Sequence, residues 1–110
     1  MDPAEQSALT AALDRMWAQF LPEMKERVGI LETTARSIAA GELSLDQQAT
    51  ANDAAHKLAG VLGTFGLTRG TVLARELEIM YSRETGTDPA LAERLASLAD
   101  ELRTLIENRK

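Results

Sequence analysis

The residues that decide the fold are 44–66, SLDQQATANDAAHKLAGVLGTFG. Ser44 followed three residues later by Gln47 is typical of a capping box, in which each side chain accepts a hydrogen bond from a backbone N–H at a helix start. Small and apolar residues then recur every three or four positions, and Gly66 stands where a left-handed residue commonly ends a helix. The segment therefore predicts an amphipathic helix, whose buried stripe is Ala51, Ala55, Leu58, Leu62 and Phe65.

The rest of the chain repeats this pattern in four further stretches. Apolar residues recur in each at spacings of three and four, which is typical of helices that bury one face. No stretch alternates with a period of two, so strands are not expected. The four stripes are Leu9, Leu13, Met16 and Phe20; Met24, Val28, Leu31, Ala35 and Ile38; Leu73, Leu77 and Met80; and Leu91, Leu95, Leu98, Leu102 and Leu105.

Proline and glycine mark the expected helix boundaries. Asp–Pro pairs at residues 2–3 and 88–89 are typical helix starts, because proline suits the first turn and aspartate can cap it. Pro22 removes one helix hydrogen bond and disfavours an α conformation at the residue before it. We therefore expect either separate helices or one long helix with a kink or a short break near residues 20–22. The other expected helix ends are Gly41 and Gly86.

The composition also favours helices. Sixteen leucines and eighteen alanines stand against only seven valines and isoleucines in 110 residues, and unbranched residues prefer helices to sheets. Short loops between the later helices require neighbouring helices to run antiparallel. We therefore predict an all-α fold, an antiparallel up-and-down four-helix bundle with an additional N-terminal helical segment, and we expect residues 1–110 to form a single domain.

Charge and cysteine content exclude several classes of function. Seventeen acidic and twelve basic residues give a net charge of −5, which does not favour binding to nucleic acid. Without cysteine there is no disulfide, thiolate zinc site or catalytic thiol. No apolar run approaches the roughly 20 residues of a membrane span, and the N-terminus does not resemble a secretory signal. We expect a cytoplasmic monomer that binds neither nucleic acid nor membrane.

His56 is the one histidine of the chain. At about 100° per residue it points away from the apolar stripe of its own helix. Gly60 and Gly63 share its face and Ala59 lies close to it, so the surface beside the imidazole should carry no large side chain. A glycine inside a helix costs about 1 kcal/mol relative to alanine. Either another helix packs closely there, or a partner's backbone or a phosphoryl group must reach the imidazole.

The chemistry open to a single exposed imidazole is limited. A zinc or iron site needs three or four ligands, and no nucleophile with an orienting acid accompanies His56. The chain also has no glycine-rich loop for binding ATP. A neutral imidazole carries a lone pair that can attack phosphorus without a separate base. These features make His56 a suitable acceptor for a phosphoryl group that another protein supplies, and the chain a carrier rather than an enzyme. The alternative is a surface histidine without a role.

Two segments, AHKLAGVLGTFG at 55–66 and TVLARELE at 71–78, resemble the histidine-containing phosphotransfer (HPt) domains of bacterial phosphorelays. The resemblance implies that His56 takes a phosphoryl group from a receiver-domain aspartyl phosphate and passes it to another receiver domain. It also implies that Gly60 and Gly63 leave room for the partner. The expected partners are response-regulator receiver domains or hybrid histidine kinases. The positions that carry the resemblance are His56, Leu58, Gly60, Gly63, Gly66, Leu73, Leu77 and Glu78.

Phosphoryl transfer needs charge neutralisation that this acidic chain does not supply. We therefore expect no cofactor in this chain, and we expect the magnesium ion to belong to the receiver domain.

One position departs from the family pattern. Many HPt domains have a lysine three residues after the histidine, where it helps to hold the phosphoryl group, and this chain has Ala59. Lys57, Arg69 and Arg75 are the candidates to supply that charge. Three alternatives stay open: a bundle that binds receivers or kinases without accepting phosphate, the excised phosphoacceptor module of a chemotaxis-type kinase, and a metal-dependent enzyme.

Overall fold

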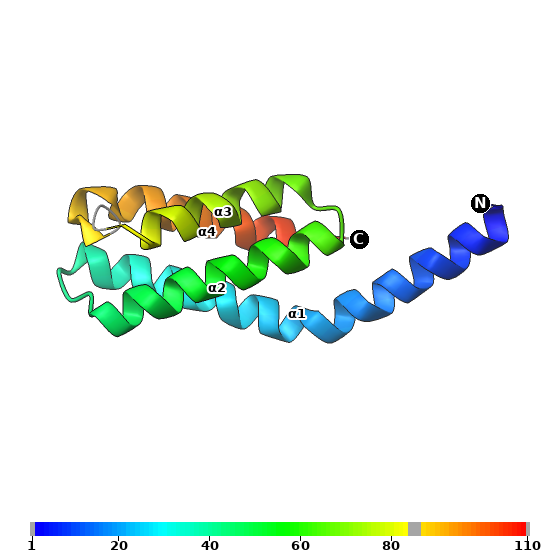
Figure 1. The fold of residues 1–110 in the computed structure, drawn as a ribbon, viewed down its shortest axis with the longest axis horizontal. Helices are drawn as coiled ribbons and strands as arrows, with labels where there is room; N and C mark the ends of the chain where they lie inside the picture. Colours follow the sequence, from blue (N-terminus) through cyan, green and yellow to red (C-terminus); the bar gives the residue numbers. More distant parts are fainter. Residues whose placement is uncertain (1, 84–86, 110) are drawn as a thin grey trace.

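The computed structural model describes residues 2–83 and 87–109, and over these residues the chain forms four α-helices, the short 3₁₀ helix η2 and no strand. Consecutive helices run antiparallel, and the last helix returns beside the first, so that each α-helix packs against two others (Figure 1). The predicted all-α, up-and-down four-helix bundle is confirmed. The elements are α1 (Pro3–Ala39), α2 (Leu45–Thr64), α3 (Thr68–Tyr81), η2 (Pro89–Leu91) and α4 (Ala92–Glu107).

The predicted helix starts are present. The Asp2 carboxylate accepts a hydrogen bond from the Glu5 N–H at 2.8 Å at the start of α1. At the start of α2, the Gln47 N–H donates to Ser44 Oγ at 3.0 Å, and the Ser44 N–H donates to Gln47 Oε1 at 2.9 Å. Asp88 caps η2, which leads directly into α4. Each cap satisfies backbone donors that the helix leaves without a partner.

Two of the three glycines expected at helix ends adopt the left-handed conformation. Gly41 after α1 and Gly66 after α2 both have a φ of 71°, a region in which a Cβ atom would be strained. Gly66 sets the short connection that turns the chain from α2 into α3. Gly86 lies outside the described residues.

Helix α1 is continuous through Pro22, so neither a short break nor two separate helices occur at this position. Figure 1 shows that its axis changes direction along the blue-to-cyan part. A proline in a helix removes one hydrogen bond and bends the axis while the turns on either side remain helical. The additional N-terminal segment is therefore the first half of α1.

The first apolar stripe is not buried, contrary to the prediction. Leu9, Met16 and Phe20 are 48%, 39% and 36% exposed, because the first half of α1 projects past the ends of the other helices (Figure 1). Trp17 is the exception. Its ring packs edge-on against Phe65 at the end of α2, with 5.1 Å between the ring centroids. The Phe20 ring also meets Phe65, with 6.4 Å between the ring centroids. Periodicity predicted the helix, but the other described helices leave most of its apolar stripe uncovered.

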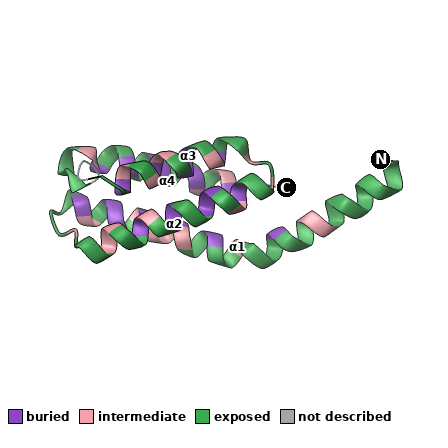
Figure 2. Cartoon of the chain, in the orientation of Figure 1, coloured by how far each residue is buried: buried purple, intermediate pink, exposed green. Residues whose placement is uncertain are grey.

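The core runs along the remaining length of the bundle, where buried residues of all four α-helices form one cluster. Figure 2 marks the buried residues in purple on each of these helices. Burial of these apolar side chains supplies most of the stabilisation of such a bundle. In the described part of the chain, no helix has the length and apolar character to cross a membrane. The largest fully buried apolar side chains are Met24, Val28, Leu31, Ile38, Leu58, Leu62, Leu73, Leu77, Leu95, Leu102 and Ile106.

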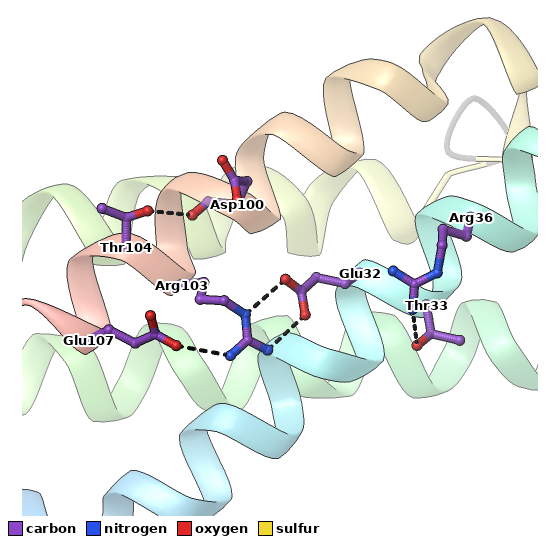
Figure 3. Close-up of polar contacts among 7 residues, drawn as sticks. All are labelled: Glu32, Thr33, Arg36, Asp100, Arg103, Thr104 and Glu107. Carbon is purple, nitrogen blue, oxygen red and sulfur yellow. Dashed lines mark hydrogen bonds and ion pairs between the residues drawn. The ribbon is translucent and has the colours of Figure 1, made fainter.

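An ion pair joins α1 to α4. Arg103 donates from Nε and Nη2 to the two carboxylate oxygens of Glu32 at 2.8 and 2.7 Å, and from Nη1 to Glu107 at 3.2 Å (Figure 3). The hydrogen bond from Arg103 and its positive charge hold the pKa of Glu32 below its usual value. Such a two-pronged contact fixes the relative position of two helices better than a single hydrogen bond.

Candidate functional site

Helix α2 presents His56 to solvent. The side chain is 70% exposed, whereas Ala55, Leu58 and Leu62 on the opposite side of the helix are fully buried. The orientation predicted from the helical periodicity is thus confirmed. Because buried neighbours hold the helix in place, the imidazole is mounted on a rigid element.

Among the residues that the structure describes, the imidazole has one hydrogen-bond partner, Glu78 of α3. Glu78 Oε2 lies 2.7 Å from His56 Nδ1. A carboxylate can only accept, so this contact places the proton of a neutral ring on Nδ1 and leaves the lone pair on Nε2. The site therefore offers a nucleophilic nitrogen beside a carboxylate that can stabilise positive charge on the ring.

Hydrogen bonds between α2 and α3 position Glu78. The Asn52 side chain, one turn before His56, donates to the Glu78 carbonyl at 2.7 Å. One turn earlier, the Gln48 side chain donates to the Tyr81 carbonyl at 2.9 Å. Sequence reasoning assigned no role to Glu78, because a contact across 22 residues depends on how two helices align. The one sequence feature that could have drawn attention to Glu78 is that it matches a position of the HPt family pattern.

The glycines near His56 lie in open space. A Cβ added at Gly60 would meet no other described atom within 4 Å, and one at Gly63 would make ordinary contact with Thr71 Oγ1 at 3.7 Å. Close packing by another helix therefore does not explain Gly60. By contrast, a Cβ at Gly70 of α3 would lie 3.0 Å from Leu62 Cδ1. Of these three glycines, Gly70 is the one at which an added Cβ would crowd a neighbour, and the sequence did not single it out.

Ala59 does not belong to the exposed surface, contrary to the prediction. It is 4% exposed and forms part of the core. Asn52 and Gly63, in the same row of α2, both contact α3, so this side of the helix is covered. A wheel places Ala59 near His56 but does not show where α3 packs.

The three basic candidates lie in different surroundings. Lys57 Nζ pairs with Asp53 of its own helix at 2.9 Å. Arg69 is held by Glu101 of α4, with contacts of 2.8 and 3.3 Å.

Arg75 lines a hollow of 380 Å³ that also contains Asn52 and Glu78. The structure brings Arg75 near the partner of His56 and directs Arg69 toward α4.

Comparison with known proteins agrees with this geometry. The model of the Hpt domain family matches residues 15–108. Protein RcaC of Microchaete diplosiphon is 33% identical over 103 residues, which cover 94% of this chain and 16% of RcaC. No solved structure matches the chain. The chain therefore belongs to the Hpt domain family, whose members carry phosphoryl groups on a histidine in phosphorelays and interact there with receiver domains or kinases.

Proposed function

We propose that the chain is a phosphorelay intermediate in which His56 Nε2 accepts a phosphoryl group from the aspartyl phosphate of a receiver domain. A second receiver domain then removes it. The observation that supports this proposal is the pairing of an exposed imidazole with Glu78, whose carboxylate engages Nδ1 and leaves Nε2 with its lone pair. Either nitrogen of a free imidazole can be the nucleophile, whereas here only one is available.

The first transfer is an in-line displacement at phosphorus. The Nε2 lone pair forms the N–P bond while the P–O bond to the receiver's aspartate breaks, and the aspartate leaves as a carboxylate with the electron pair. The proton stays on Nδ1, where Glu78 accepts its hydrogen bond at 2.7 Å. The carboxylate stabilises the positive charge that develops on the ring, as an orienting acid does for a catalytic histidine. The second transfer reverses these bond changes.

The surface around His56 suits a protein partner. Gly60 leaves open space one turn further along α2. On α3, the apolar side chains of Val72 and Ile79 are 49% and 51% exposed, and Ile79 lines the same hollow as Glu78. Exposed apolar side chains beside a polar site favour contact with another protein. This combination supports docking of a receiver domain over the face that carries His56.

The chain acts as a carrier in this proposal, and the catalytic machinery belongs to its partners. Phosphoryl transfer needs a magnesium ion or other positive charge at the phosphate, and this chain has a net charge of −5. The magnesium ion and its acidic pocket accordingly reside in the receiver domain. Residues 1–110 work as one domain, a cytoplasmic monomer, that binds one receiver or hybrid kinase at a time.

A transfer assay against a panel of phosphorylated receiver domains tests the proposal. We expect acid-labile, alkali-stable label on the wild-type chain, NMR signals that place phosphorus on Nε2, and no label on His56→Gln. Circular dichroism should show the same helix content for both, since His56 is exposed. Equal labelling of His56→Gln overturns the assignment. Binding of a receiver without any transfer to the wild-type chain overturns it in favour of a docking bundle.

A further inference from the structure

A phosphoryl group on His56 meets an electrostatic difficulty. The Glu78 carboxylate lies 2.7 Å from Nδ1, on the other side of the same five-membered ring from Nε2. The chain as a whole is acidic, with a net charge of −5. A carboxylate at Nδ1 and a phosphoryl group at Nε2 repel each other across the ring. A cation on the Nε2 side of the ring would therefore stabilise a phosphohistidine at this position.

Most arginines near the bundle surface are already paired with carboxylates. Arg69 binds Glu101, and Arg94 Nη2 lies 2.6 Å from Glu76. Lys57 is paired with Asp53 and lines a different hollow, on the side of α2 that faces α1. Over residues 2–83 and 87–109, no carboxylate lies within ion-pair distance of Arg75.

The alignment of α2 and α3 places Arg75 one turn from the His56 contact. His56 meets Glu78, and seven residues further along α2 Gly63 approaches Thr71. The two helices therefore run antiparallel in register. Arg75 lies three residues before Glu78, between these two contacts, and so stands at the level of residues 59–60 of α2. That level is one turn beyond the imidazole.

Space for a phosphoryl group exists at the same level. Gly60 has no side chain, and a Cβ there would find no neighbour within 4 Å in the described part of the chain. Arg75 also lines the hollow shared by Asn52, Glu78 and Ile79.

We propose that Arg75 binds the phosphoryl group carried on His56, through its guanidinium and the phosphoryl oxygens. This proposal rests on the phosphoryl-acceptor role of His56. An arginine presents a planar fork of donors that matches phosphate oxygens, and hydrogen bonds between charged groups are stronger than neutral ones. Arg75 thereby offsets the repulsion from Glu78 and makes transfer to Nε2 more favourable.

Two measurements on Arg75→Gln test the proposal. The matched controls are Arg69→Gln and Arg83→Gln, the latter at an exposed arginine just after the C-terminal end of α3. In the first, a phosphorylated receiver donates to the chain, and the transfer rate constant is measured at saturating receiver. In the second, phosphoramidate phosphorylates His56 without any protein partner, with ammonia as the leaving group, and ³¹P NMR follows the ionisation of the phosphoryl group with pH.

We expect Arg75→Gln to slow saturated transfer about 10-fold or more, because the variant loses hydrogen bonds between charged groups at the phosphoryl oxygens. The last ionisation of the phosphoryl group should move to higher pH in this variant, because the nearby cation favours the dianion. Arg75→Lys should restore part of both effects. Both control variants should behave as the wild type.

Two results would overturn the role of Arg75 without affecting that of His56. In the first, Arg75→Gln behaves like Arg69→Gln in both measurements. In the second, Arg75→Gln binds the receiver more weakly, but its saturated transfer rate and its ³¹P titration are unchanged. In either case His56 is still labelled, so its acceptor role stands. If the wild-type chain takes no label from a receiver or from phosphoramidate, both proposals fail together.

Discussion

Two polar pairs in this bundle use a carboxylate in different ways. Between α1 and α4, Glu32 and Arg103 engage each other through two hydrogen bonds, and the remaining guanidinium nitrogen binds Glu107 (Figure 3). Between α2 and α3, Glu78 engages only one of the two nitrogens of His56. The Arg103 side chain is 30% exposed, whereas that of His56 is 70% exposed.

The difference lies in what each pair leaves unused. All three nitrogens of Arg103 have partners, so the pair has no capacity for further chemistry and acts to hold two helices together. His56 retains a nitrogen with a lone pair on an exposed surface. A polar pair that leaves a nucleophilic atom open is a better candidate for function than one that is saturated.

The largest expected effect is on the transfer rate, and it should distinguish the carboxylate of Glu78 from that of Glu32. Glu78→Ala should slow transfer from a phosphorylated receiver by about 10-fold to 100-fold, because the ring loses the acceptor that keeps the proton on Nδ1. Glu78→Gln should retain more activity, since its side-chain oxygen can still accept. Glu32→Gln is the control and should transfer at the wild-type rate. If Glu78→Ala accepted the phosphoryl group at the wild-type rate, the contact between Glu78 and His56 would have only a structural role.

Removal of Arg103 should have the converse effect. Arg103→Gln should lower the free energy of unfolding by about 1–3 kcal/mol, because it leaves the half-buried Glu32 without its cation. Chemical denaturation measures this loss. Glu78→Ala should change stability by no more than about 0.5 kcal/mol. If Arg103→Gln and Glu78→Ala lost the same amount of stability, the α1–α4 pair would not be more structural than the α2–α3 pair.

Two glycines of the α2–α3 pair sharpen the same comparison. Gly60→Ala should raise stability by up to about 1 kcal/mol, because alanine favours the helix and the added Cβ meets open space. Gly60→Ala should also slow transfer, because the added methyl group occupies space that the partner protein needs near His56. Gly70→Ala should lower stability, since its Cβ would lie 3.0 Å from the buried Leu62. Thermal unfolding and the transfer assay together distinguish these outcomes.

The smallest effect is the pH dependence of the α1–α4 pair. Because the pKa of Glu32 is lowered in the folded chain, its contribution to stability is fully present above the ordinary value of 4.5. That contribution is lost as the pH falls through the lowered value. The difference in melting temperature between wild type and Glu32→Gln should therefore shrink on acidification below pH 4.5. A difference that stays constant would contradict this assignment.

Local chemistry made much of the fold predictable from sequence. The capping box at Ser44 and Gln47 and the left-handed Gly41 depend on residues within one turn. The outward orientation of His56 follows from the helical period alone. These features need no knowledge of how helices pack.

The features that sequence reasoning missed depend on neighbours. The stripe at Leu9 and Met16 has the same spacing as the buried ones, but no other described helix extends far enough to cover it. Ala59 lies close to His56 on a wheel, yet α3 covers it. Glu78 meets His56 only because α2 and α3 align in one particular register. A single helix wheel contains none of this information.

The single free nitrogen of His56 also has a kinetic consequence. In the proposed relay, a donor and an acceptor that both react at Nε2 would have to occupy the same face of α2 and α3 in succession, so no ternary complex would form. The relay would then follow double-displacement kinetics, in which each partner inhibits at high concentration by competing for the form of the chain that the other requires.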